Sequence, residues 1–228
     1  MWKILDISND ESEKIVLEAK KVSEFRHKCK YFLEKNNLIY DKFTVVEHDS
    51  EIGYIAEQQL LKYLIKEFKN INVKHWTENF DLEEIKNILQ KSDPQEDEIN
   101  LIKTFFYDKY DILLSSKMKK IYIDVKTAKT QKTPSSNWNF LYPTVQTNKK
   151  EDDCVVLTYL IYNHDHLYQM YIVGVINYNE ILNSEIQKKG TFTKFHTCSR
   201  TDNYITYLRD YKDLTEYINI YFNLDSKN

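Results

Sequence analysis

Two aspartates and a lysine border two short apolar runs near the middle of the chain. Asp111 directly precedes the run 112–114, Asp124 directly follows the run 121–123, and Lys126 lies two residues further on. A polar turn separates the two runs, and this pattern is typical of a β-hairpin. Closing a hairpin brings its outer ends side by side, so we expect the two carboxylates to lie close together.

Residue types at these positions favour one chemistry. Side chains alternate between the two faces of a strand, so Asp124 and Lys126 are expected on one face and Val125 in the opposite, buried layer. Paired carboxylates are the hard oxygen ligands that Mg2+ takes, with water and substrate phosphate completing its coordination. A neighbouring ammonium can position an attacking water and stabilise charge that develops on phosphorus. The pattern therefore predicts phosphodiester hydrolysis.

The order Asp111, then Asp124-Val125-Lys126, resembles the D…(D/E)xK signature of the PD-(D/E)XK nuclease superfamily, with Tyr110 in place of the proline. Members of that superfamily often carry a helical glutamate in a GxxxE context, which Gly53 to Glu57 matches. The resemblance covers about residues 51–178. It implies an α/β fold: a mixed central β-sheet flanked by α-helices, with a restriction-endonuclease-like core.

The resemblance also implies roles for individual residues. Glu57, Asp111, Asp124 and Lys126 would be catalytic, and Asp111, Asp124 and the carbonyl of Val125 would hold Mg2+. The size of the chain is most similar to that of a type II restriction endonuclease, a Mg2+-dependent enzyme that cuts double-stranded DNA. A homodimer would match the two-fold symmetry of a palindromic site.

Other interpretations of the same residues remain open. An Asp-x-Lys pair on an amphipathic strand is commonly a solvated face, Asp111 could be a turn residue at a strand entry, and Glu57 could be an ordinary exposed helix position. A repair, phage or transposon-linked endonuclease of the same superfamily is one alternative function. A non-catalytic DNA-binding module is another, and it predicts binding that is indifferent to Mg2+.

Several further elements must position these residues. Apolar residues at helical spacing predict helices over about 8–33, 51–68 and 211–224. Two long apolar runs predict buried strands over 154–162 and 168–178. By resemblance, part of 138–146 is expected to form a helix that crosses between strands, although Pro143 would interrupt it. We expect one domain over 1–228 with a catalytic core at about 49–178, extended by the helix 8–34 and by 179–228 for dimerisation or DNA recognition.

Polar side chains that follow the hairpin are candidates for DNA contact. Between residues 117 and 132 there are six lysines and one acid, and such a strip can meet phosphates. A lysine-rich turn can equally keep a strand edge soluble. The candidates for DNA contact are Lys129, Gln131, Lys132, Asn137, Asn139, Arg200 and Asn203.

Composition bounds the class of protein. The formal net charge is −3 over 228 residues, so the chain as a whole does not show the basic balance of many DNA-binding domains. The three cysteines stand in no CxxC arrangement, which argues for a reducing compartment and against a zinc knuckle. With no apolar run long enough to span a membrane and no signal-peptide pattern, we expect a cytoplasmic protein.

Overall fold

The computed structural model describes residues 2–38, 47–107, 110–146, 154–164, 166–192 and 198–224. Its centre is a mixed sheet of six strands in the order β1-β7-β6-β4-β3-β2, in which β4 and β6 run parallel and all other neighbours antiparallel. The strands are β1 (Lys3–Asp6), β2 (Asn72–His75), β3 (Ile112–Ser115), β4 (Lys120–Thr130), β6 (Cys154–Asn163) and β7 (His166–Asn177). The expected α/β class with a mixed central sheet is confirmed.

The predicted hairpin is present as β3 and β4. Ile112 pairs with Ile123 and Ser115 with Lys120, and the Ser116 N–H donates to the carbonyl of Lys119 to close the turn. One face of β4 carries Ile121, Ile123 and Val125, all of which belong to the largest buried cluster. The period-2 alternation that placed Val125 in the buried layer is therefore confirmed.

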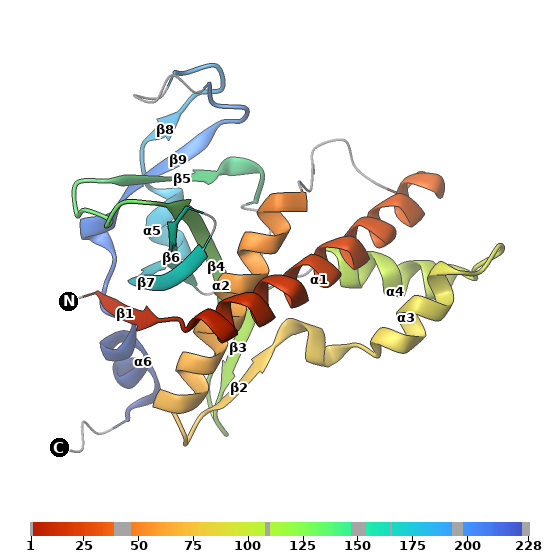
Figure 1. The fold of residues 1–228 in the computed structure, drawn as a ribbon, viewed down its shortest axis with the longest axis horizontal. Helices are drawn as coiled ribbons and strands as arrows, with labels where there is room; N and C mark the ends of the chain where they lie inside the picture. The colour runs from red at the N-terminus through yellow and green to blue at the C-terminus, as the bar shows by residue number, and fades with distance from the viewer. Residues whose placement is uncertain are drawn as a thin grey trace.

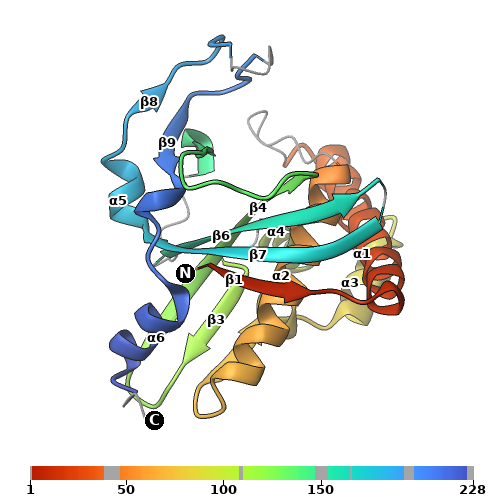
Figure 2. The ribbon, with the colours of Figure 1, turned by 60° about the vertical axis from the view of Figure 1, so that its left-hand side comes forward.

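Helices cover that face of the sheet. They are α1 (Asn9–Lys35), α2 (Glu47–Glu67) and α6 (Leu214–Phe222). Ser8 caps α1 by accepting a hydrogen bond from the Glu11 N–H at 3.3 Å, as its position before an acidic first turn predicts. One buried cluster contains Ala19 of α1, Leu60 of α2 and Ile218 of α6, so the first and last helices belong to the central packing. Figure 2 shows α2 lying across the strands and α6 beside the hairpin.

The opposite face is covered by a smaller sheet. This sheet has the order β5-β9-β8 and consists of β5 (Asn139–Pro143), β9 (Asn203–Tyr207) and β8 (Ile186–Gln187), followed by the 3-10 turns η2 (Thr144–Gln146) and η3 (Leu208–Asp210) and accompanied by α5 (Tyr178–Leu182). The expected core helix within 138–146 is wrong, because 139–143 form a strand and 144–146 only a single 3-10 turn. The strand pairs antiparallel with β9, which lies some sixty residues later in the chain. Pairing over that distance leaves no local signal in the sequence.

A helical arm extends from the sheet at the open end of the β3–β4 hairpin, where Trp76 donates its N–H to the Asp111 carbonyl. It is formed by the 3-10 turn η1 (Trp76–Asn79), α3 (Leu82–Leu89), α4 (Glu96–Phe106) and the C-terminal half of α1. In Figure 1 this arm lies on the right, away from the small sheet. A separate buried cluster containing Phe32, Trp76, Ile85 and Phe105 holds the arm together. No helix in the described ranges is long and apolar enough to cross a membrane.

Candidate active site

Asp111 and Asp124 lie opposite each other at the open end of the hairpin. The Ile112–Ile123 pairing puts them at the next register position, and the Asp111 N–H donates to the Ile123 carbonyl at 2.9 Å. The backbone pairing of β3 with β4 ends at Ile112. Beyond it, the Asp111 side chain replaces a backbone partner, because its Oδ2 accepts a hydrogen bond from the Val125 N–H at 2.6 Å. Asp111 is 4% exposed and Asp124 is fully buried.

The carbonyl of Val125 belongs to the same corner of the site. Within a strand the N–H and C=O of one residue point to the same side, and the Val125 N–H points toward Asp111. The three predicted oxygen donors, two carboxylates and one carbonyl, therefore come from adjacent positions on two strands.

Lys126 forms an ion pair with Asp124. Its Nζ lies 2.8 Å from Oδ1 and 2.7 Å from Oδ2, and the lysine side chain is 16% exposed. Tyr142, from β5, donates its hydroxyl to Oδ2 of the same carboxylate at 3.1 Å, and the Lys126 Nζ lies 5.6 Å from the centroid of the Tyr142 ring. The small sheet thus supplies a buried residue that fixes the rotamer of Asp124.

Glu57 lies on the helix-covered side, in contact with a histidine. Its Oε2 is 2.9 Å from Nε2 of His75, the last residue of β2, and Nδ1 of that ring is 2.7 Å from the Thr77 hydroxyl. Both Glu57 and His75 are buried. No hydrogen bond or ion pair joins Glu57 to Asp111, Asp124 or Lys126 within the described residues.

The strand β2 nevertheless connects this pair to the hairpin. His75 is the register partner of Ile112, and the N–H of the next residue, Trp76, donates to the carbonyl of Asp111 at 3.0 Å. A Cβ added at Gly53 would lie 3.6 Å from Glu57 Oε1, which is an ordinary van der Waals contact, so the space beside the glutamate does not require a glycine. The GxxxE spacing thus places a small residue one helical turn before a buried carboxyl.

The donor set bears on which cation would fit. In the described part of the chain no three His, Cys, Asp or Glu side chains are grouped so that they could hold a metal by themselves. Mg2+ is characteristically bound by one or two carboxylates together with waters and substrate phosphate. Asp111 and Asp124 with the Val125 carbonyl fit that mode, and they do not fit the imidazole and thiolate sites typical of structural zinc.

Six of the seven candidates for DNA contact are exposed: Lys129, Gln131, Lys132, Asn137, Asn139 and Arg200. The ammonium of Lys129 lies 4.1 Å from the centroid of the Tyr162 ring, and burial raises the pKa of Tyr162 to about 12, so this phenol stays neutral. Asn203 differs. It is 6% exposed, its amide donates to the Thr201 carbonyl at 2.8 Å, and its position within β9 leaves its side chain facing the protein.

His75 and Tyr142 are the functional candidates that sequence reasoning missed. Each has a weak local signal: a histidine ends a short strand, and a tyrosine stands before a proline. Neither signal identifies the partner, because His75 meets a residue of α2 and Tyr142 a residue of the other sheet.

Comparisons of the chain with protein-family models, with curated proteins and with solved structures found no match.

Proposed function

We propose that the protein is a Mg2+-dependent endonuclease that hydrolyses phosphodiester bonds of double-stranded DNA. The observation that carries this proposal is the pair of buried carboxylates at one hairpin end, Asp111 and Asp124, with Lys126 bonded to the second of them. Buried carboxylates are costly unless they are paired, hydrogen-bonded or used to bind a cation. This arrangement supplies two anionic oxygen donors and one cation at the open end of one hairpin.

Asp111, Asp124 and the carbonyl of Val125 would hold the Mg2+ ion. When bound, the ion would supply a Lewis acid toward a phosphate oxygen and lower the pKa of a bound water. Asp111 is oriented for this task by the Val125 N–H, and Asp124 by Lys126 and Tyr142. Such supporting contacts fix the direction of ligand oxygens.

Lys126 would act on the substrate. Its side chain is 16% exposed whereas that of Asp124 is fully buried, so Lys126 is the member of the pair that a phosphate would approach. A fixed cation there would stabilise the negative charge that builds on the phosphoryl group. Holding the same ammonium against Asp124 keeps it in place before substrate arrives, so little reorganisation is needed. Glu57, kept in place by His75, would contribute from the neighbouring strand end.

We further propose a restriction-endonuclease-like core and a type II activity, in which a homodimer cuts a palindromic sequence in a cytoplasmic setting. The antiparallel run β2-β3-β4 followed by a parallel β6 supports the core assignment, together with the D…DxK order of the site. The free cysteines, Cys29, Cys154 and Cys198, support a reducing compartment.

The test is digestion of plasmid and phage DNA by purified protein, with Mg2+ or with EDTA, and in parallel by the Lys126→Ala variant. Discrete fragments that require both Mg2+ and Lys126 are the expected result. Cutting that depends on branched or damaged DNA structure, and not on sequence, would favour a repair-type endonuclease over a restriction endonuclease. Mg2+-independent binding of DNA, with no cleavage of modified or unmodified DNA, would contradict the proposal that the protein is a nuclease.

A further inference from the structure

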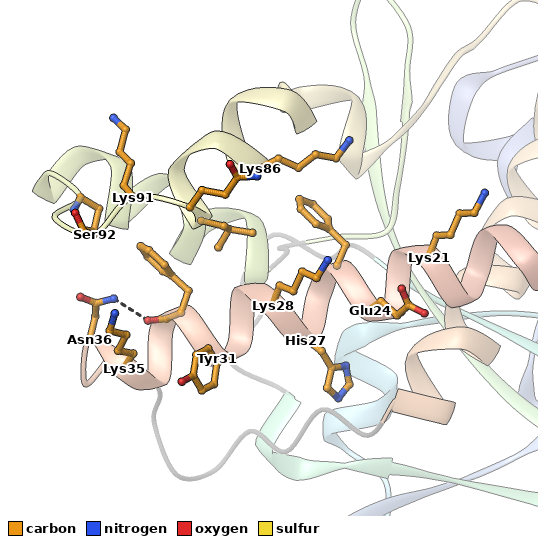
Figure 3. Close-up of a pocket in the computed structure, with 15 residues that line it drawn as sticks. Lys21, Glu24, His27, Lys28, Tyr31, Lys35, Asn36, Lys86, Lys91 and Ser92 are labelled. Carbon is orange, nitrogen blue, oxygen red and sulfur yellow. Dashed lines mark hydrogen bonds between the residues drawn. The ribbon is translucent and has the colours of Figure 1, made fainter.

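A groove runs between the C-terminal half of α1 and the segment formed by α3 and the residues after it. Its volume is about 770 Å³. Five lysines line it, against a single acid, Glu24: Lys21, Lys28, Lys35, Lys86 and Lys91. Figure 3 shows Lys21 and Lys28 rising from α1 on the side that faces α3, while His27 and Tyr31 point to the other side of the helix. Lysines thus outnumber acids among the lining residues, although the whole chain carries a formal charge of −3.

The lysines of α1 form a regular row. Lys14, Lys21, Lys28 and Lys35 recur at intervals of seven residues, which is close to two helical turns, so they lie along nearly one line of the helix surface. All four are exposed, and none forms an ion pair with another residue that the structure describes. Glu18 and Glu24 are exposed on the same helix at a spacing of three or four residues from these lysines, so the row is interleaved with two acids. Within the groove, Lys21, Lys28 and Lys35 still outnumber the one acid, and this excess of positive charge attracts an anionic partner.

The lysines on the opposite wall are neutralised. Lys86 pairs with Glu83 and Lys91 with Glu98, and the hydrogen bond from Lys91 lowers the pKa of Glu98. The free positive charge of the groove therefore lies on α1. The part of the row that lines the groove runs from Lys21 to Lys35, and a rise of 1.5 Å per residue over these fourteen residues gives a length of about 21 Å. That length suits an extended polyanion and exceeds any small phosphate.

The floor of the groove connects it to the candidate active site. Phe32 lines the groove and is 7% exposed, and it belongs to the same buried cluster as Trp76. Trp76 follows His75 directly and donates its backbone N–H to Asp111. Whatever binds the groove is thereby held by a packed arm whose base is part of the site.

We propose that this groove binds the sugar-phosphate backbone of double-stranded DNA through the lysine row of α1, without any metal. The choice of DNA as the polyanion rests on the proposed function. The contact is to phosphate, so it contributes affinity and orientation and is indifferent to base sequence. It lies apart from the polar segment after the hairpin, where contacts with bases are expected.

The test measures binding of a fluorescent DNA duplex by anisotropy, in EDTA, over about 50 to 200 mM salt. The variant is K21Q/K28Q/K35Q, and the matched control is K66Q/K69Q/K74Q, which removes three exposed lysines from the end of α2, from the turn that follows it and from β2. Each lost phosphate contact reduces the slope of log affinity against log salt by about 0.9, so the groove variant should lose about 2.7 from the slope. Its affinity at about 0.1 M salt should fall on the order of 100-fold, while the control variant keeps most of the wild-type affinity.

Two results would overturn the proposal: a wild-type slope in the groove variant, or equal losses in the groove and control variants. If the triple variant proves unstable in thermal unfolding, the single Lys28→Gln variant should still reduce the slope by about 0.9. Because the EDTA assay needs no catalysis, it separates the groove from the nuclease activity. Failure of Mg2+-dependent cleavage with a groove-dependent slope would leave the groove proposal standing.

Discussion

Truncating His75 should destabilise the protein through the carboxyl that it leaves behind. In the His75→Ala variant Glu57, whose side chain is 9% exposed, loses a hydrogen bond of 2.9 Å and has little access to water as a replacement. Removing one partner of a buried pair costs about 3–5 kcal/mol, and a hydrogen bond to a charged group alone is worth about 1.5–3 kcal/mol. We therefore expect the free energy of unfolding to fall by about 3 kcal/mol or more.

Urea denaturation followed by circular dichroism measures this quantity, and a double-mutant cycle isolates the pair. The double variant Glu57→Ala/His75→Ala should be more stable than the sum of the two single effects predicts, by at least about 1 kcal/mol. Lys74→Ala, an exposed neighbour on β2, is the control and should change stability by less than about 0.5 kcal/mol. A His75→Ala variant within about 0.5 kcal/mol of wild type, or an additive cycle, would refute the coupling.

Three further predictions concern other parts of the molecule. Gly174 has φ 147° and its Cβ would lie 2.2 Å from the Lys212 carbonyl oxygen, so Gly174→Ala should lower the free energy of unfolding by about 2–5 kcal/mol in urea; an unchanged midpoint would contradict it. Tyr142→Phe removes a buried donor to Asp124 and should cost about 1–3 kcal/mol, measured in the same way, with no loss meaning that the hydroxyl does not support the carboxylate. The hydrogen bond from Lys62 of α2 holds the pKa of Glu11 below its ordinary 4.5. This contact therefore stabilises the fold above pH 4.5, and the stabilisation is lost as the pH falls through the lowered pKa. The stability advantage of wild type over Glu11→Gln should therefore vanish in acid, whereas a constant difference across pH would contradict the ion pair.

Much of the hairpin could be predicted because its information is local. The apolar runs, the polar turn and the alternation of Asp124, Val125 and Lys126 all lie within a few residues of one another, and a strand has a side-chain period of two wherever it forms. The same holds for the helix that begins after Ser8, where the capping residue and the apolar spacing agree. Burial of Val125 follows from that alternation.

What could not be predicted depends on partners far away in the chain. β5 was expected to be helical, yet its partner β9 lies beyond two long strands, and pairing decides the conformation of such a short segment. β1 has only four residues and gains its structure from β7. His75 and Tyr142 become informative only when α2 and the small sheet bring their partners to them.

A single-turnover cleavage assay on double-stranded DNA, with wild type, Asp124→Asn and Asp10→Asn compared in Mg2+, tests the central claim most directly. Asp10 is an exposed aspartate at the start of α1, so Asp10→Asn changes the same charge away from the site. The account predicts Mg2+-dependent cleavage by wild type and by Asp10→Asn, and loss of cleavage by Asp124→Asn with retained DNA binding. Full cleavage by Asp124→Asn would contradict the assignment of the hairpin end as the active site.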